Sequence, residues 1–453
     1  MKKILLILFC LATLSVAFAE GEREIIKEYW MKDLEPFEAE RFISPEKCAE
    51  CHEEIFDMWD GSMHSKALDD PLFVAATKLF VGKATHPGEL EDAEHCVSCH
   101  NPIAYRSGQI KGSSDDYSNV DDVSRWSISC DVCHTIDEIV MLKNQSFNTD
   151  PGDGEDDAGV KRGPRDDADA MFHDSEFSAI HTSSQICGTC HNVTHLWYMT
   201  KLEGTYDEWA SSPYNSPDPD KIVNCQDCHM RQSPGTPATG MTDRPDYPGS
   251  SADMGEDRDH IWRHYVSGAN TFTPTLLGHP ERVAMAVERL ENAATLEIMA
   301  DKANGKKYSA LTVRVKNEGA GHMLPTGVTE FRQMWLELTV SNKKGKVLYR
   351  SGGLDSSGAL SPETRIFQTV FGDPEGNPTI NVSEAAVMLT DHRVPPKGWC
   401  DETYSLPKSL SGPLTVHAEL KYRSMDPQLV NALLDGEHDV PIVTMTTIES
   451  VLK

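Results

Sequence analysis

Positive charge is scarce in this sequence. Its 453 residues include 42 Lys and Arg against 71 Asp and Glu, which gives a formal net charge of −29. Nucleic acids and anionic membrane surfaces are themselves negative and would repel such a chain. We therefore exclude nucleic acid as a partner, and a basic partner or a metal-oxide-like surface fits the charge better.

Long apolar runs are also absent beyond the first residues. Lys2 and Lys3 precede an apolar stretch over 4–16, and the small-residue cleavage pattern of 17–19 follows. This is the pattern of a secretory signal peptide, and the apolar stretch is shorter than the about 20 residues that span a bilayer. Cys10 follows a bulky residue where lipidation needs a small one. We predict a signal peptide over 1–19, no transmembrane segment, and an exported, soluble protein that is periplasmic or extracellular.

What the sequence does contain is a cysteine motif in five copies. Each copy reads Cys-x-x-Cys-His, and the spacings between them are too uneven for a regular repeat. The five copies are Cys48-Ala-Glu-Cys51-His52, Cys96-Val-Ser-Cys99-His100, Cys130-Asp-Val-Cys133-His134, Cys187-Gly-Thr-Cys190-His191 and Cys225-Gln-Asp-Cys228-His229.

This motif is the attachment signature of c-type haem. Its two thiols add to the two vinyl groups of the haem, and the adjacent imidazole binds the iron. Zinc sites would pair Cys-x-x-Cys units in twos and would not need a His after every unit. The sequence therefore predicts five covalently attached haem c groups.

Few cysteines remain once the motifs are counted. Ten of the 12 cysteines lie in the motifs and Cys10 belongs to the signal peptide, which leaves Cys400. An odd exported cysteine is either a buried thiol or half of an intermolecular bridge. Its apolar, strand-like neighbours favour the buried thiol.

The first half of the chain is too dense in motifs to build an ordinary apolar core, so the haems themselves must provide it. The segments between motifs favour short helices, for example over 53–59 and 176–186, and loops.

Residues 232–258 are rich in Pro, Gly, Ser and Asp and indicate a connector. Pro280 begins a predicted helix with Val283, Ala286, Val287 and Leu290 on one face.

Beyond this helix the apolar period changes from helical to alternating. Alternation runs through 311–316, 336–340 and 414–422, with a turn at 343–345 leading into 347–349. Several such strands predict an antiparallel, immunoglobulin-like β-sandwich. The predicted fold class is thus α+β and multidomain: a signal peptide over 1–19, a haem-dense, mostly helical and irregular cytochrome c domain over 20–270, a connecting helix over 271–295 and the sandwich over 296–453.

The first half resembles the multihaem cytochromes of the cytochrome c-554 family, which are electron-transfer partners and relatives of hydroxylamine oxidoreductase. The second half resembles the β-sandwich often fused to such cytochromes, and the likeness covers most of 40–425. The residues that carry the resemblance are the first motif with Trp59-Asp-Gly-Ser62-Met63-His64, Ile128-Ser-Cys130-Asp-Val-Cys133-His134, Glu208-Trp209 to Tyr214 before Cys225-Gln-Asp-Cys228-His229-Met230, Gly319-Ala-Gly-His322-Met-Leu-Pro325-Thr-Gly327, Asp391-His-Arg393-Val-Pro395-Pro396 and Leu420-Lys-Tyr-Arg423.

The motifs supply the proximal iron ligands His52, His100, His134, His191 and His229, and the sixth ligands remain to be chosen among the other 13 of 18 histidines. A second His gives low-potential electron-transfer haems, a Met raises the potential, and an open position allows substrate chemistry. The resemblance implies a ligand at His64. Context favours His322 in a Gly-rich loop, His264 and His181 next, with His195, His95 and His173 in reserve. Five others, His86, His279, His392, His417 and His438, we interpret as surface or structural.

We expect an electron-transfer protein that connects a redox donor and acceptor through closely packed, mainly bis-His haems. The protein's own work is then to fix iron spacing, potentials and the docking surface, since the cofactor carries the redox chemistry. We favour such an electron carrier over an enzyme. One alternative is a reductase or oxidase of a small nitrogen or sulfur compound at one open haem, with Arg263, Tyr265, Arg106 and Tyr105 as candidate lining residues. A further alternative is a subunit of an extracellular cytochrome filament or of an outer-membrane electron conduit.

Overall fold

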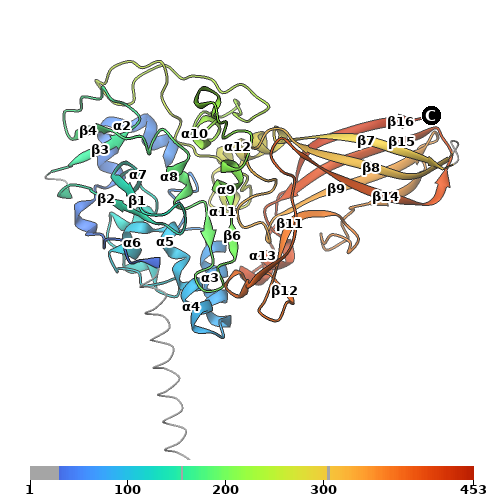
Figure 1. The fold of residues 1–453 in the computed structure, drawn as a ribbon, viewed down its shortest axis with the longest axis horizontal. Coiled ribbons are helices and arrows are strands. Elements are labelled where there is room, and N and C mark those ends of the chain that lie inside the picture. Colours follow the sequence, from blue (N-terminus) through green and yellow to red (C-terminus); the bar gives the residue numbers. More distant parts are fainter. Residues whose placement is uncertain (1–29, 155–156, 304–306) are drawn as a thin grey trace, which may run out of the picture.

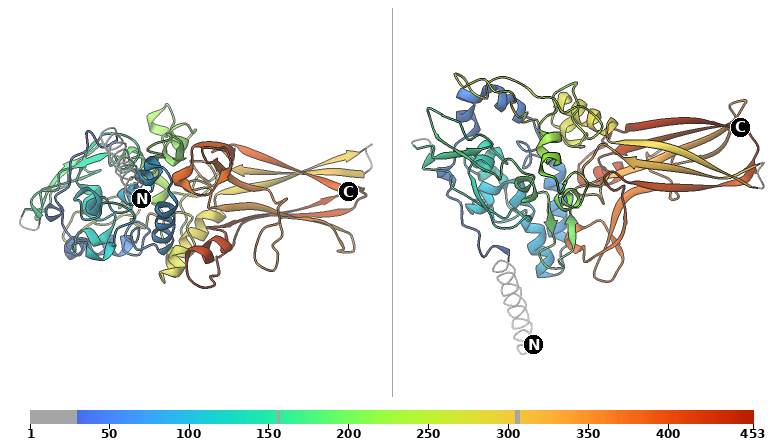
Figure 2. Two further views of the ribbon diagram at one scale, coloured as in Figure 1. Left: turned by 90° about the horizontal axis from the view of Figure 1, so that it is seen from below. Right: turned by 45° about the horizontal axis from the view of Figure 1, so that its top comes forward.

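The computed structural model describes residues 30–154, 157–303 and 307–453, so the predicted signal peptide and Cys10 lie outside the described residues. A part of short helices and small sheets is followed by a part of long strands that extend away from it (Figures 1 and 2). None of the helices in the described ranges is both long enough and apolar enough to cross a membrane.

The first part consists of short elements joined by loops. Its six strands pair as three two-stranded sheets, β1 with β2, β3 with β4 and β5 with β6. The elements are α2 (Pro45–Trp59), α3 (Pro71–Lys83), α4 (Pro87–His95), α5 (Val97–His100), α6 (Pro102–Arg106), α7 (Cys130–His134), β1 (Ile136–Ile139), β2 (Phe147–Thr149), β3 (Val160–Gly163), β4 (Asp174–Phe177), α8 (Gln185–Gly188), β5 (Val193–Thr194), β6 (Lys201–Glu203), α9 (Thr205–Ala210) and α10 (Cys225–His229), with short 3₁₀ turns between some of them.

Proline and a polar cap begin several of these helices. In α2, α3 and α6 a proline stands in the first turn, where its missing N–H costs nothing. The preceding Ser44, Asp70 and Asn101 accept hydrogen bonds from the first free N–H groups. The helix predicted over 53–59 is confirmed as the end of α2.

The helix predicted over 176–186 is wrong. The segment starts in β4 and continues through turns, in which the Thr182 and Ser183 hydroxyls bond to carbonyls three residues earlier. Hydroxyl side chains that bond to the nearby backbone compete with helix formation. The helix α8 begins only at Gln185.

Buried apolar residues are divided very differently between the two parts. The second part has one cluster of 24 buried residues. The largest cluster confined to the first part has seven, among them Phe37, Phe42 and Phe147. A part with such small apolar clusters needs other apolar material to hold it together, as expected if haems form its core.

The connector over 232–258 contains no helix or strand, in agreement with its composition. The helices α11 (Thr273–Leu276) and α12 (Pro280–Glu291) follow it. The predicted helix from Pro280 is therefore confirmed. It buries Met285, Ala286 and Leu290 on one side.

The second part contains two antiparallel sheets. One has the order β12-β11-β9-β15-β16, with β10 also on β9 and β13 on β11, and the other has the order β14-β8-β7. The strands are β7 (Ala294–Ala303), β8 (Lys307–Asn317), β9 (Gln333–Asn342), β10 (Val347–Ser351), β11 (Ile366–Gly372), β12 (Pro378–Thr379), β13 (Val387–His392), β14 (Trp399–Leu410), β15 (Leu414–Arg423) and β16 (Val443–Leu452), and α13 (Pro427–Leu433) lies between the last two.

The alternating residues predicted from the sequence form the core between these sheets. In β9 and β15, Leu336 pairs with Leu420 and Val340 with Val416, all fully buried, and Val313 of β8 belongs to the same cluster. The structure therefore has mixed helix and sheet with an antiparallel, sheet-rich C-terminal region. The immunoglobulin-like arrangement and the domain boundaries stay predictions. Cys400 is half-buried against this core.

Candidate haem sites

Each Cys-x-x-Cys-His motif lies on or beside a helical turn. The first, second, third and fifth motifs fall on α2, α5, α7 and α10, and the fourth begins in α8. On a helix, residues three and four apart share one face. The two cysteines and the histidine of a motif therefore point to the same side, as attachment of one haem requires.

The proximal histidines are oriented through their Nδ1 atoms. Four of them donate Nδ1–H to a backbone carbonyl at 2.7–2.9 Å. This hydrogen bond sets the tautomer and leaves the Nε2 lone pair free for a metal. The pairs are His52 with Ser251 O, His100 with Ala67 O, His134 with Arg162 O and His229 with Ser267 O.

His191 is the exception. Its Nδ1 lies 3.3 Å from Oε1 of Glu203, a carboxylate rather than a carbonyl. A carboxylate acceptor makes an imidazole a stronger electron donor to its metal. Glu203 is a functional residue that the sequence analysis missed, because nothing about its position in the sequence sets it apart.

Three further histidines face three of these proximal rings. The ring centroids of His64 and His191 lie 6.1 Å apart, those of His264 and His134 6.3 Å, and those of His322 and His229 6.4 Å. A fourth pair joins His173, held in reserve in the sequence analysis, to His52 at 6.4 Å.

These separations fit one iron between each pair of rings. A metal–imidazole bond is about 2 Å long and the ring centroid lies about 1.2 Å behind the bound nitrogen, so two imidazoles on opposite sides of one metal have centroids about 6.4 Å apart. In His173, His264 and His322 the Nδ1 is already used by a backbone carbonyl at 2.8–2.9 Å, as in most of the proximal rings. The donor set therefore fits bis-His haem at four sites.

Burial keeps most of these rings neutral, the form that binds a metal. It lowers the pKa of His64 and of His264 to about 4, with smaller contributions from neighbouring charges. Burial is also the largest cause that lowers the pKa of His134, His229 and His322. At neutral pH these rings carry a lone pair rather than a second proton.

His181 lies beside a proximal ring, but closer to it than the histidines of the four pairs. Its ring is stacked on that of His134 with centroids 5.5 Å apart, against 6.3 Å for His264 and His134. Its Nε2 lies 2.9 Å from the carbonyl oxygen of Cys133, and its Nδ1 is buried without a hydrogen-bond partner. Ligation of an iron by His181 stays a prediction.

The structure also contradicts the prediction for His195. Its fully buried ring accepts hydrogen bonds at Nδ1 from the N–H groups of Trp197 and Tyr198, and its Nε2–H donates to Ser383 O at 2.8 Å. No lone pair is left for an iron. His195 is four residues after His191, so a helix would place both on one face, but the segment between them contains a bend and the short strand β5.

His100 has a different neighbour from the other proximal rings. Phe73 of α3 stacks on it with centroids 3.6 Å apart and an interplanar angle of 8°. Among the residues the structure describes, we find no histidine ring opposite it as at the other four sites. The side chains considered for an open haem have protein partners: Arg106 donates to Phe147 O, and Arg263 pairs with Glu54.

The five motifs form one connected array. Cysteine side chains of different motifs contact one another. These contacts join the first motif to the third, the second to the fourth and the fourth to the fifth. A cysteine of the third motif is also close enough to one of the fourth for the two to interact electrostatically. The pairs are Cys48 with Cys130, Cys99 with Cys190, Cys187 with Cys225 and Cys133 with Cys190. The first motif lies at one end of this array, and the fifth lies beside the second part of the chain.

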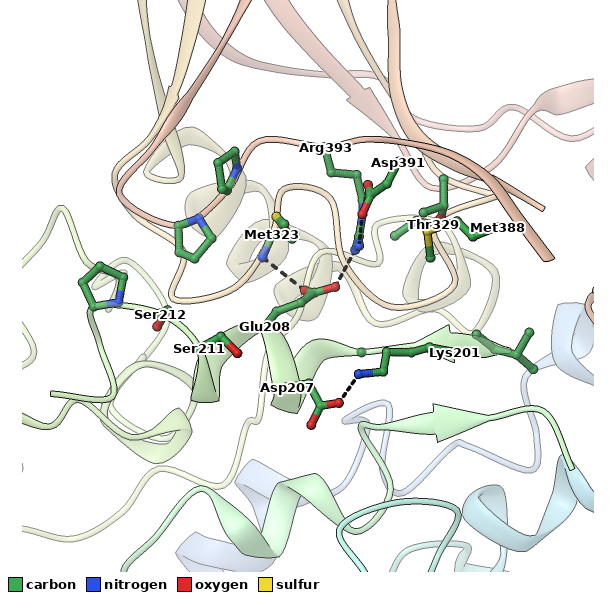
Figure 3. A pocket seen from close by; sticks show the side chains of 16 residues that line it. Lys201, Asp207, Glu208, Ser211, Ser212, Met323, Thr329, Met388, Asp391 and Arg393 are labelled. Carbon is green, nitrogen blue, oxygen red and sulfur yellow. Dashed lines mark hydrogen bonds and ion pairs between the residues drawn. The ribbon is translucent and has the colours of Figure 1, made fainter. Parts of the chain in front are cut away.

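The loop that carries His322 is tied to the first part by Glu208 of α9. One Glu208 oxygen accepts hydrogen bonds from Met323 N–H at 3.1 Å and from the Thr326 hydroxyl at 2.6 Å. The other pairs with Arg393, which also pairs with Asp391 (Figure 3). Glu208, Met323, Asp391 and Arg393 line a cavity of about 440 Å³ between the two parts.

Comparisons with known proteins agree with this geometry. The family model described as cytochrome c554 and c-prime matches residues 47–135. Among solved structures, the chain is similar to a penta-heme cytochrome c552 from Thermochromatium tepidum, with a TM-score of 0.60 and 21% identity, covering 92% of this chain and 100% of that one. No curated protein matches the sequence.

The motifs, their helical placement and these matches define a multihaem c-type cytochrome with five covalently attached haem c groups. The region of its first three motifs is similar to the family described as cytochrome c554 and c-prime.

Proposed function

We propose that this chain is an exported pentahaem electron-transfer protein whose haems pass electrons between a redox donor and a redox acceptor. The observation that carries the proposal is the set of four imidazole pairs at 6.1–6.4 Å. Two imidazoles give six-coordinate, low-potential haem that exchanges electrons without binding a substrate.

The connected array of motifs supports the same function. Contacts between the cysteines of different motifs keep the attached haems close together, the condition for rapid electron hopping. The ligand assignments in this proposal are His52 with His173, His134 with His264, His191 with His64 and His229 with His322.

Export follows from the signal-peptide pattern over 1–19, and haem c attachment outside the cytoplasm agrees with it. The second part, proposed as an immunoglobulin-like sandwich beginning near residue 296, then acts as a cap that donates His322 to the fifth haem. Assembly into a filament or an outer-membrane conduit remains a separate proposal, tested by sedimentation below.

Quantitative electron paramagnetic resonance of the oxidised protein tests the function. We expect at least four low-spin haems per chain with the signals of bis-His ligation. Fewer than four low-spin haems would contradict the ligand pairs and with them the proposed function.

The haem of the second motif supports a second candidate function. Because His100 meets Phe73 rather than a histidine, this iron is the one candidate among the described sites for reduction or oxidation of a small nitrogen or sulfur compound. One high-spin haem in five that binds nitrite or hydroxylamine would favour this function. A fifth low-spin signal would exclude it.

A further inference from the structure

The first haem site lies at the outer end of the molecule. Its motif is on α2 and the facing His173 comes just before β4. Figure 1 shows both elements at the edge of the helical part farthest from the long strands. The array of cysteine contacts also ends at this motif.

Two exposed segments, 251–259 and 166–177, flank this site. Ser251 O accepts the hydrogen bond that orients His52, and Asp253 N–H donates to Cys51 O at 2.7 Å. The other segment, 166–177, contains His173 itself. Both segments are therefore held against the first haem site by direct contacts.

The three most exposed large apolar side chains of the described residues lie in these two segments. Met254 is 83% exposed, Met171 72% and Phe172 71%. Exposed apolar residues scattered singly need no explanation, but three gathered around one site mark an interaction surface.

Carboxylates surround these apolar residues. Segment 166–177 contains five, all exposed, and no lysine or arginine, while segment 251–259 contains four exposed carboxylates. The single basic residue of the second segment, Arg258, is neutralised by ion pairs with Asp167 and Glu256. The surface thus has an apolar centre and an acidic rim.

We infer that this surface, named here the first-haem face and defined by residues 166–177 and 251–259, docks a basic redox protein that carries its own exposed redox centre. Transient electron-transfer complexes are small, with an apolar centre inside a charged rim. The inference rests on the proposed electron-transfer function and specifies the partner class and the site of contact.

The negative charge of the rim restricts which proteins the apolar centre can bind. A positive rim on the partner would be steered to this face, since opposite fields raise association rates. A second copy of the chain is disfavoured, because two acidic rims would meet. One electron passes from a ferrous haem of this chain to the ferric centre of the partner, and no atom or proton is transferred.

Stopped-flow kinetics with a basic mitochondrial cytochrome c as the probe tests the inference. The reduced protein is mixed with the oxidised probe, and the second-order rate constant is followed as ionic strength rises. We expect it to fall about tenfold or more between about 10 and 300 mM salt, because screening shortens the range of steering. Plastocyanin, an acidic redox protein, serves as the opposite-charge probe and should react more slowly at low salt.

Variants locate the contact. The triple variant D166N/D169N/D257N should lower the low-salt rate constant by about threefold to tenfold. The matched control E363Q/E375Q/E437Q removes three exposed carboxylates from the second part and should change the rate by less than about twofold. The variant M171S/M254S should lower the rate at both low and high salt, because it removes apolar contact rather than charge.

Equal slowing by the two triple variants would overturn the inference, because the rate constant would then depend on the net charge of the protein and not on the first-haem face. A rate that rises with salt, or a faster reaction with the acidic probe, would also overturn it. Low-spin signals in all variants would keep the proposed function intact, so failure of docking and failure of electron transfer are distinguishable.

Discussion

Whether a histidine of this chain can bind an iron depends on what holds its other ring nitrogen. His322 uses Nδ1 for Met323 O and leaves Nε2 free toward His229. His195 has hydrogen-bond partners at both nitrogens. Two histidines that were both ligand candidates in the sequence therefore differ in whether a ring nitrogen is left free for an iron.

This difference gives a direct prediction. The variant His322→Ala should convert one low-spin haem to a high-spin, carbon monoxide-binding form, whereas His195→Ala should leave all spin states unchanged. Removing His195 instead orphans buried partners and should lower the free energy of unfolding by about 1–3 kcal/mol. Electron paramagnetic resonance and denaturant unfolding measure the two effects, and a new high-spin signal in His195→Ala would contradict the assignment.

Glu203 should tune the potential of the fourth-motif haem. Its carboxylate beside Nδ1 of His191 stabilises the oxidised iron, so Glu203→Gln should raise the reduction potential of one haem by an amount on the order of tens of millivolts. Spectroelectrochemical titration measures the shift, with E363Q as the control. An unchanged set of five potentials would exclude the role.

His392 supplies a pH-dependent contribution to stability away from the haems. Its Nε2 lies 2.6 Å from the buried Glu402 carboxylate, and this hydrogen bond raises the pKa of His392 above its usual value of 6.5. The stabilisation is thus complete below pH 6.5 and is lost as pH rises through the raised pKa.

The stability difference between the unmodified protein and His392→Gln should therefore be larger at pH 6 than at pH 9. Urea unfolding followed by far-ultraviolet circular dichroism measures it. A difference that grows with pH would contradict the ion pair.

At the scale of elements, periodicity predicted the long strands well and the short elements poorly. β8, β9 and β15 alternate over enough residues to define an inner face, which the burial of Leu311, Leu338 and Ala418 confirms. Segment 176–186 lacks such a period, and its hydroxyl side chains bond to the local backbone instead of allowing a helix.

The His322 loop is the element that connects the two parts, and Glu208 holds it. The variant Glu208→Ala removes the acceptor of Met323 N–H and leaves Arg393 with Asp391 alone. We expect a partial high-spin signal from one haem and a loss of about 1–3 kcal/mol in unfolding free energy, because buried donors lose their acceptor while Arg393 keeps Asp391.

The neighbouring Asp207→Ala is the matched control, because Asp207 pairs with Lys201 at the more exposed edge of the same cavity. It should leave the spin states unchanged. A high-spin signal in both variants would attribute the effect to general loosening rather than to the His322 loop.

At the scale of the whole molecule, the acidic surface argues for separate molecules in solution. A chain with a net charge of −29 repels its copies unless a specific interface overcomes the repulsion. Sedimentation velocity at moderate salt should show one species near the 50.2 kDa chain mass plus its haems. Large polymers would favour the filament alternative instead.

The sequence alone determined the cofactor and its number, and it predicted the five proximal histidines, because haem c attachment is a local covalent pattern within five residues. It also determined the strand-rich second part, because alternation is a local property. Tertiary structure decided which histidines lie opposite the proximal ones. His173 meets His52, and His322 meets His229 from the other part of the chain, because such pairs depend on how distant segments pack and on which ring nitrogen the surrounding backbone already holds.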